Sequence, residues 1–113
     1  MTRLYHITTS AEADAARTSG TYEPGGFARE GFIHCSYARQ VTSVANRLFR
    51  GQADLVLLEI DPSTVEHRIV DENLEGGDEL FPHIYGRLAF TSVVAVHAFQ
   101  CGAAGDFVFP TAG

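Results

Sequence analysis

The sequence predicts a single domain of the mixed α+β class, and three observations carry this prediction. A chain of 113 residues is long enough for one hydrophobic core and too short for two. Hydrophobic residues make up 45% and charged residues 19%, as in folded globular proteins. Helical patterns occur early and strand patterns late, so the strict alternation of a doubly wound sheet is not kept. We therefore expect two short helices early in the chain, packed against several strands.

The N-terminal segment predicts a strand followed by a short helix. Residues 3–8 alternate in character, which is typical of a strand. Thr9 and Glu12 have the spacing of a capping box, and the alanine-rich residues 11–17 continue as a helix that Gly20 ends.

Residues 21–30 contain the turn Pro24-Gly25-Gly26 and predict a loop. Two interpretations stay open for this loop, a lid over a site or an ordinary surface connection whose aromatics cover the edge of the core. Residues 31–36 then predict a strand that runs into a helix capped by Ser36. Gly51 ends this helix, and its apolar face consists of Val41, Val44, Ala45, Leu48 and Phe49.

The second half of the chain predicts mainly strands. Residues 54–60 form a nearly continuous apolar run, which indicates a central strand covered on both faces. Residues 67–70 predict a short strand that leads into the acidic turn 71–79. Residues 93–99 predict a late strand, and residues 107–109 an edge strand limited by the following proline.

The charge of the chain limits its partners. The formal net charge is −6, and all eight basic residues are arginine. An acidic chain without a basic run is unsuited to an extended nucleic acid or an anionic membrane, whereas a small anionic ligand remains compatible with it. The sequence has neither a membrane-spanning apolar run nor a signal peptide at its N-terminus. We expect a cytoplasmic protein that is a monomer or a weak dimer.

Histidines are the residues best suited to chemistry in this sequence, which contains five of them. His67 is predicted to be exposed and His97 to be a partly buried structural residue with one satisfied nitrogen. The other three lie where predicted strands meet apolar or aromatic neighbours. If the first two strands are neighbours, these three and Tyr85 converge in one cleft; the alternative is three unrelated structural histidines: His6, His34 and His83.

Other chemistries are less well supported by the residues. The histidines lack HxH or HExxH spacing, so a metal-dependent enzyme is only a third hypothesis. Cys35 follows His34 directly, and adjacent strand residues point to opposite faces, so we predict that Cys35 is a buried packing residue. The sequence also lacks a Walker loop, GxGxxG and GxSxG.

Four stretches together resemble the family named domain of unknown function 952, and the resemblance covers nearly the whole chain. This family looks like a compact relative of the ADP-ribosyltransferase fold, in which two small split sheets clasp NAD. The stretches are, in order, Leu4-Tyr5-His6-Ile7, Gly31-Phe32-Ile33-His34-Cys35-Ser36, Glu72-Asn73 followed by Gly76-Gly77, and Phe81-Pro82-His83-Ile84-Tyr85-Gly86.

The resemblance implies roles for individual residues. His6 would hydrogen-bond a ribose of NAD, and His34 would line the nicotinamide-ribose side. The transferases place a glutamate on a late strand, but residues 93–99 contain no acid. His83, Tyr85 or Glu79 would then stand in for that glutamate.

Two sets of site residues follow for a protein that binds NAD as cofactor. Arg29 or Arg87 could meet the pyrophosphate, although a surface ion pair is the commoner fate of an arginine. Ser36 completes the cofactor-binding set with His6, His34 and Arg29, and the catalytic set is His34, His83 and Tyr85. The alternative is a non-catalytic module, for a small molecule or a partner, in which the histidines are structural.

Overall fold

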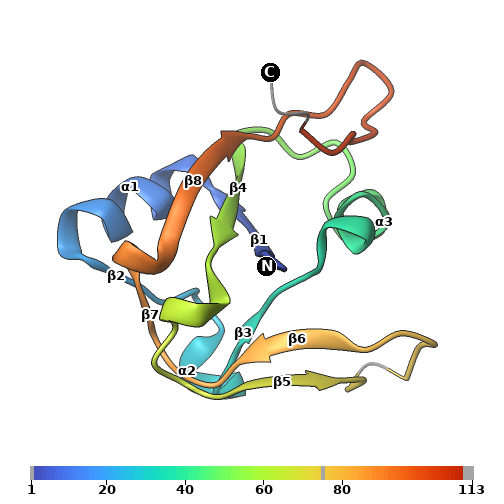
Figure 1. The fold of residues 1–113 in the computed structure, drawn as a ribbon. Coiled ribbons are helices and arrows are strands. Elements are labelled where there is room, and N and C mark those ends of the chain that lie inside the picture. The colour runs from blue at the N-terminus through green and yellow to red at the C-terminus, as the bar shows by residue number, and fades with distance from the viewer. Residues whose placement is uncertain (1, 75, 111–113) are drawn as a thin grey trace.

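Three antiparallel sheets organise residues 2–74 and 76–110, the part of the chain that the computed structural model describes (Figure 1). The predicted α+β class is therefore confirmed. In chain order the elements are β1 (Leu4–Thr9), α1 (Ser10–Ser19), β2 (Thr21–Tyr22), α2 (Phe27–Glu30), β3 (Ile33–His34), α3 (Ala38–Leu48), β4 (Leu55–Ile60), the 3-10 turn η1 (Pro62–Thr64), β5 (Ile69–Glu72), β6 (Phe81–Ile84), β7 (Leu88–Ala89), the 3-10 turn η2 (Phe90–Ser92) and β8 (Val93–Ala98).

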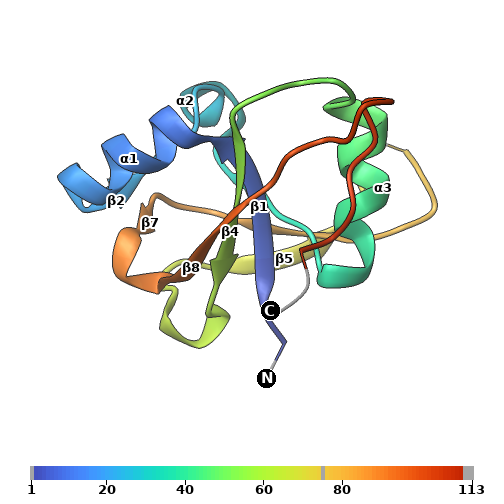
Figure 2. The same cartoon turned by 90° about the horizontal axis from the view of Figure 1, so that it is seen from above.

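The largest core surrounds the sheet with strand order β1-β4-β8. Strand β4 is central, as its apolar run predicts, and Leu57 and Leu58 are completely buried on its two faces. One face packs on α1 through Ala13 and Ala16, and the opposite face packs on α3. Figures 1 and 2 show α1 and α3 on either side of this sheet.

The two predicted helices are present, but their N-terminal caps differ from each other in kind. Thr9 accepts the backbone N–H of Glu12 at 3.1 Å and begins α1, as predicted. The predicted cap of α3, Ser36, is wrong, because Tyr37 occupies the N-cap position and its N–H donates to Gln40 Oε1 at 3.0 Å. Ser36 uses its backbone in a strand pairing instead.

That pairing is the point where two sheets separate. Tyr5 and Ser36 exchange two backbone hydrogen bonds of 2.8 Å, which form an isolated bridge between β1 and the segment after β3. Beyond this bridge the β1-β4-β8 sheet and the β3-β6-β5 sheet diverge, with α3 beside the opening (Figure 1). The predicted strand 31–36 is thus shortened to Ile33–His34: the Cys35 N–H still donates to the Pro82 carbonyl of β6 at 3.0 Å, but Ser36 pairs with Tyr5 of β1 instead.

Residues 21–30 form a mostly exposed surface connection whose aromatics cover the edge of the core, the second of the two interpretations. Tyr22 lies in β2, pairs with Leu88 of β7 and is only 2% exposed, and the half-buried Phe27 packs against the same core cluster. The segment also contains the four-residue helix α2, a third α-helix beyond the two that the sequence predicts.

The predicted edge strand 107–109 is also wrong. The backbone N–H of Phe107 donates to Asn46 Oδ1 at 2.7 Å rather than to a neighbouring strand. The Phe107 ring stacks on Phe99 with centroids 4.8 Å apart and joins the cluster that covers α3. The apolar pattern of this segment therefore reflects burial by side-chain packing.

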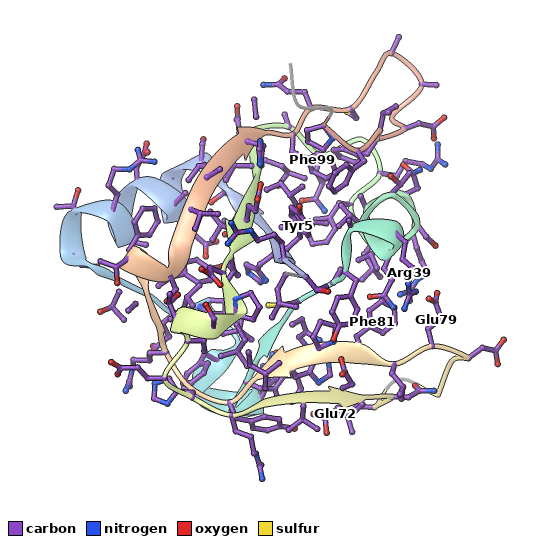
Figure 3. The ribbon with its side chains drawn as sticks, in the orientation of Figure 1. Tyr5, Arg39, Glu72, Glu79, Phe81 and Phe99 are labelled. Carbon is purple, nitrogen blue, oxygen red and sulfur yellow. The ribbon has the colours of Figure 1, made fainter. Side chains whose placement is uncertain are left out.

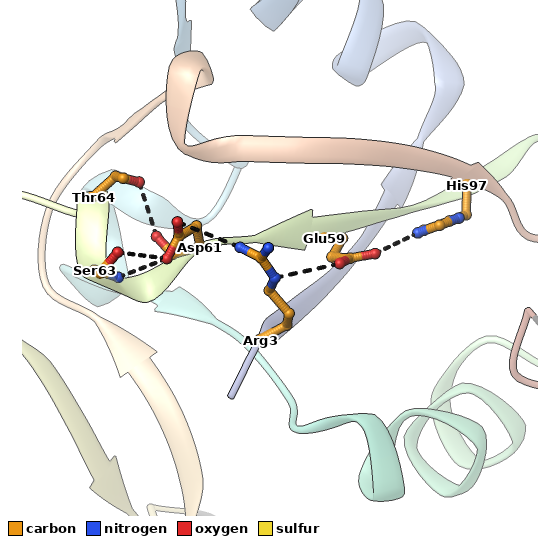
Figure 4. A network of polar contacts seen from close by, with 6 residues as sticks. All are labelled: Arg3, Glu59, Asp61, Ser63, Thr64 and His97. Carbon is orange, nitrogen blue, oxygen red and sulfur yellow. Dashed lines mark hydrogen bonds and ion pairs between the residues drawn. The ribbon is translucent and has the colours of Figure 1, made fainter. Parts of the chain in front are cut away.

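The remaining late elements agree with the sequence in kind. The short strand predicted at 67–70 is β5, which begins two residues later, and the strand predicted at 93–99 is β8. His67 is exposed, and His97 Nε2 lies 2.8 Å from Glu59 Oε1, as predicted for a structural histidine. Arg3 connects Glu59 to Asp61 in the same network (Figure 4).

Candidate functional site

A cavity of about 260 Å³ lies between α3, the edge strand β1 and the β3-β6-β5 sheet. Four residues predicted for the site line it: His6, His34, Ser36 and His83. Glu72 and Arg47 add charged groups to its wall, and most of the remaining lining residues are apolar: Ile7, Val44, Leu48, Phe49, Leu74 and Phe81. Such a mixture of apolar surface and a few polar groups is typical of small-molecule sites.

His6 is held by the protein through both ring nitrogens. Nδ1 donates to the carbonyl oxygen of His34 at 2.5 Å, and Nε2 lies 2.7 Å from the Tyr22 hydroxyl. That hydroxyl lies 3.0 Å from Thr8 Oγ1. Burial lowers the pKa of His6 to about 4, so the ring is neutral at pH 7. The ribose contact that the family resemblance implies would require one of these bonds to break.

His34 and His83 meet because they are register partners in β3 and β6. Their ring centroids are 4.8 Å apart, and Phe32 stacks on His83 at 4.4 Å and contacts His34 edge-on at 4.7 Å. His34 Nε2 donates to Glu30 Oε2 at 3.1 Å, and the His34 side chain is 42% exposed. The predicted convergence of these two histidines is confirmed, with His34 as the accessible member of the pair.

Glu72 is a cavity residue that reasoning from the sequence missed. Its Oε1 accepts hydrogen bonds from His83 Nδ1 at 2.9 Å and from the Tyr85 hydroxyl. These bonds, that of Tyr85 first and that of His83 second, hold the pKa of Glu72 below its usual range. Glu72 is consequently ionised at neutral pH. Its place in the stretch Glu72-Asn73 was the signal in the sequence, and Glu72 is the last residue of β5.

Tyr85 contacts this site through Glu72. Its hydroxyl donates to the carboxylate, which raises the pKa of Tyr85, and its ring lies 5.3 Å from that of Phe32. The residues lining the cavity do not include Tyr85. Tyr85 and the deeply buried His83 therefore both donate a hydrogen bond to the Glu72 carboxylate and orient it.

The predicted arginines do not reach the cavity. Arg29 is exposed on α2 and is absent from the cavity lining. Arg87 forms an ion pair with Glu23 and lies over the Phe27 ring, with its guanidinium carbon 5.8 Å from the centroid. The surface ion pair, the alternative that the sequence left open for such an arginine, is what Arg87 forms.

Glu79, the third residue considered from the sequence as a substitute for the transferase glutamate, lines a second cavity of about 330 Å³. It accepts a hydrogen bond from Arg39 Nη1 at 2.9 Å across the space between α3 and the β5–β6 hairpin (Figure 3). Val44, Arg47 and Phe81 line both cavities, which are therefore adjacent.

The structure also bears on a thiol nucleophile, a metal site and a membrane-spanning helix. Cys35 is 3% exposed, and burial raises its pKa, so it is a neutral packing residue as predicted. Among residues 2–74 and 76–110, no group of three or more His, Cys, Asp or Glu side chains is arranged to hold a metal ion. Within the same residues, every helix is too short or too polar to cross a membrane.

Replacing Tyr22 by phenylalanine tests the hydrogen bonds beneath His6. The change leaves His6 Nε2 without its partner in the core, and we expect a loss of about 1–3 kcal/mol in the free energy of unfolding, measured with urea. Tyr37→Phe is the matched control, because its hydroxyl bonds Asp71 in an exposed position. Equal losses in the two variants would contradict a special role for the Tyr22 hydroxyl.

Comparisons with known proteins agree with this fold and leave its activity open. The crystal structure of protein CC0527 from Caulobacter crescentus is 34% identical, with a TM-score of 0.83 over 94% of this chain and 93% of that one. A double mutant of CC0527 gives the same values, and its solution NMR structure is 36% identical, with a TM-score of 0.81 over 94% and 91% of the two chains. No curated protein matches the sequence.

A protein family also matches this chain over most of its length. The match covers residues 7–96, which include every residue of the cavity described above except Tyr5 and His6. The chain therefore belongs to the family described as "Protein of unknown function (DUF952)".

Proposed function

We propose that the first cavity binds the nicotinamide-riboside end of NAD, or of a related nucleotide, as the resemblance to the ADP-ribosyltransferase fold implies. The observation that carries the proposal is the ionised Glu72 carboxylate, which is oriented by His83 and Tyr85 at the wall of a largely apolar cavity. A volume of about 260 Å³ lies just below the ~300 Å³ at which small-molecule pockets begin, so the cavity has room for one compact half of a dinucleotide and not for the whole.

The same carboxylate supplies what cleavage of a glycosidic bond needs. When the bond between the ribose carbon and the nicotinamide nitrogen breaks, its electron pair neutralises the ring nitrogen. Positive charge develops on the ribose, and a fixed carboxylate stabilises it. The oxygen of water or another acceptor then bonds to that carbon and releases its proton. In this proposal His34 binds a ribose hydroxyl, and His83 and Tyr85 keep Glu72 in place.

Titration with NAD, ADP-ribose and nicotinamide, followed by thermal shift and calorimetry, tests the proposal. We expect saturable stabilisation by NAD, and an affinity about tenfold weaker in His34→Ala, the size expected for one lost hydrogen bond. Glu72→Gln is expected to abolish any release of nicotinamide, measured by chromatography. His97→Ala, whose partner Glu59 lies outside both cavities, serves as control. No thermal shift at millimolar NAD would refute the proposal.

A second candidate is a binding module without catalysis, and the hydrogen bonds of His6 favour it. Both of its nitrogens already have partners in the protein, as expected for a structural histidine. The two functions differ in what His34→Ala does to the protein without ligand. A structural His34 predicts a stability loss above about 1 kcal/mol, whereas a ligand-facing residue with a 42% exposed side chain predicts little change.

A further inference from the structure

We propose that Glu30, which lies outside the lining of the first cavity, makes this cavity select ligands that donate a hydroxyl group. Glu30 acts through His34: its carboxylate accepts a hydrogen bond from one ring nitrogen and leaves the other nitrogen as an acceptor for the ligand. Glu30 is thus a positioning residue. This inference rests on the proposed function, because it states how the cavity recognises the ribose.

The short helix α2 and the turn after it place the Glu30 carboxylate. Glu30 is the last residue of α2, and Gly31 follows it with a φ of 83°. Glycine adopts this left-handed conformation without steric cost. The chain turns there, and β3 then brings His34 back beside Glu30, where His34 Nε2 donates to Glu30 Oε2 at 3.1 Å.

The second oxygen of this carboxylate lies against Gly26. A Cβ atom on Gly26 would be 2.9 Å from Glu30 Oε1, which is closer than real Cβ contacts. Gly26 has a φ of −88° and a ψ of 0°, and it is the third residue of the turn that the Phe27 N–H closes on the Pro24 carbonyl. Most residues tolerate that position. The absent side chain of Gly26 therefore leaves room for the carboxylate beside His34.

This contact decides which nitrogen of His34 is open to a ligand. An ionised carboxylate can only accept, so the proton of the neutral ring lies on Nε2 and Nδ1 has a lone pair. Within residues 2–74 and 76–110, no protein group bonds Nδ1. Phe32 and His83 contact the ring at centroid distances of 4.7 Å and 4.8 Å. Since His34 lines the cavity, Nδ1 is the nitrogen left for a ligand.

The neighbouring His83 follows the same pattern. Its Nδ1 donates to Glu72 Oε1, which leaves Nε2 as the acceptor nitrogen. Both histidines therefore give their ring protons to carboxylates of the protein and keep lone pairs, and both line the cavity together with Glu72. A ribose hydroxyl can donate to such a wall, whereas a group of the same size without a proton cannot.

Calorimetric titration with nicotinamide riboside, and with the analogue in which fluorine replaces both ribose hydroxyls, tests this inference. Fluorine is close to a hydroxyl in size but cannot donate. We expect the wild-type protein to bind the riboside about tenfold more tightly, the size expected for one hydrogen bond. His34→Ala should bring this ratio close to one, and Glu30→Ala should lower it to about threefold or less.

Two further measurements separate positioning from a structural role. Urea unfolding of Glu30→Ala should match the wild type, because the Glu30 and His34 side chains are 40% and 42% exposed. Nitrogen-15 NMR of the ligand-free protein should show His34 protonated on Nε2 alone, with shifts that move toward those of free histidine in Glu30→Ala.

A pair of glycine variants tests the position of the carboxylate without removing it. Gly26→Ala should displace Glu30 Oε1 and lower the preference for the riboside. Gly25→Ala is the matched control, because a Cβ atom there has nothing within 4 Å, and its preference should equal that of the wild type.

The outcomes distinguish this inference from the proposed function. Equal wild-type affinities for the two ligands, an unchanged preference in Glu30→Ala, or a wild-type His34 protonated on Nδ1 would overturn the inference and leave the proposed function standing. If neither NAD nor the riboside binds, the proposed function fails and the inference fails with it.

Discussion

Phe99→Ala is expected to lower the free energy of unfolding by about 3–5 kcal/mol, which is the range for deleting a buried phenylalanine ring. Phe99 is 1% exposed and stacks on Phe107 in the cluster that includes Val41 and Ala45 of α3. The loss is measured by urea unfolding. Since α3 forms a wall of both cavities, we also expect a weaker thermal shift with any ligand of either cavity.

Val108→Ala is the control for this prediction, because Val108 follows Phe107 directly and is 78% exposed. Its stability should stay within about 0.5 kcal/mol of the wild type, as for most surface substitutions. A loss below about 1 kcal/mol in Phe99→Ala would mean that the C-terminal segment does not complete the core around α3.

Stability is expected to fall by about 3 kcal/mol between pH 6.5 and pH 4 because of His6 alone. Burial in the fold lowers the pKa of His6 to about 4, whereas the unfolded chain keeps the ordinary histidine pKa of 6.5. Over this interval the unfolded chain binds the proton and the folded protein does not, so a falling pH favours unfolding. Above pH 6.5 the ring is neutral in both states and the effect vanishes. Urea unfolding at several pH values measures the slope.

His6→Asn is the variant that isolates this contribution. The asparagine amide can still donate to the His34 carbonyl, but it has no proton to gain in this pH range. The variant should be less stable at pH 7 and should show a flatter slope between pH 6.5 and pH 4.5. An unchanged slope in His6→Asn would show that other groups cause the acid sensitivity.

The elements that the sequence predicts well are those whose pattern is local. The capping spacing of Thr9 and Glu12 predicts α1, and the apolar run in residues 54–60 predicts the central strand β4. The segment at 107–109 has an equally strong strand pattern, yet its backbone bonds Asn46, which is 61 residues away in the sequence. Periodicity reports that a face is buried, but it does not report whether a strand or a side chain covers it.

The residues of the candidate site also divide into those that local sequence identifies and those that only the tertiary structure identifies. From sequence alone, the unusual settings of His6, His34 and His83 and the buried role of Cys35 were determined, because their neighbours on the chain define those settings. Only the tertiary structure decided that Glu72 is the acid of the cavity and that Arg29 lies away from it. The antiparallel register of β3, β6 and β5 brings His34, His83 and Glu72 together. Register depends on hydrogen bonds between distant segments, which no local pattern contains.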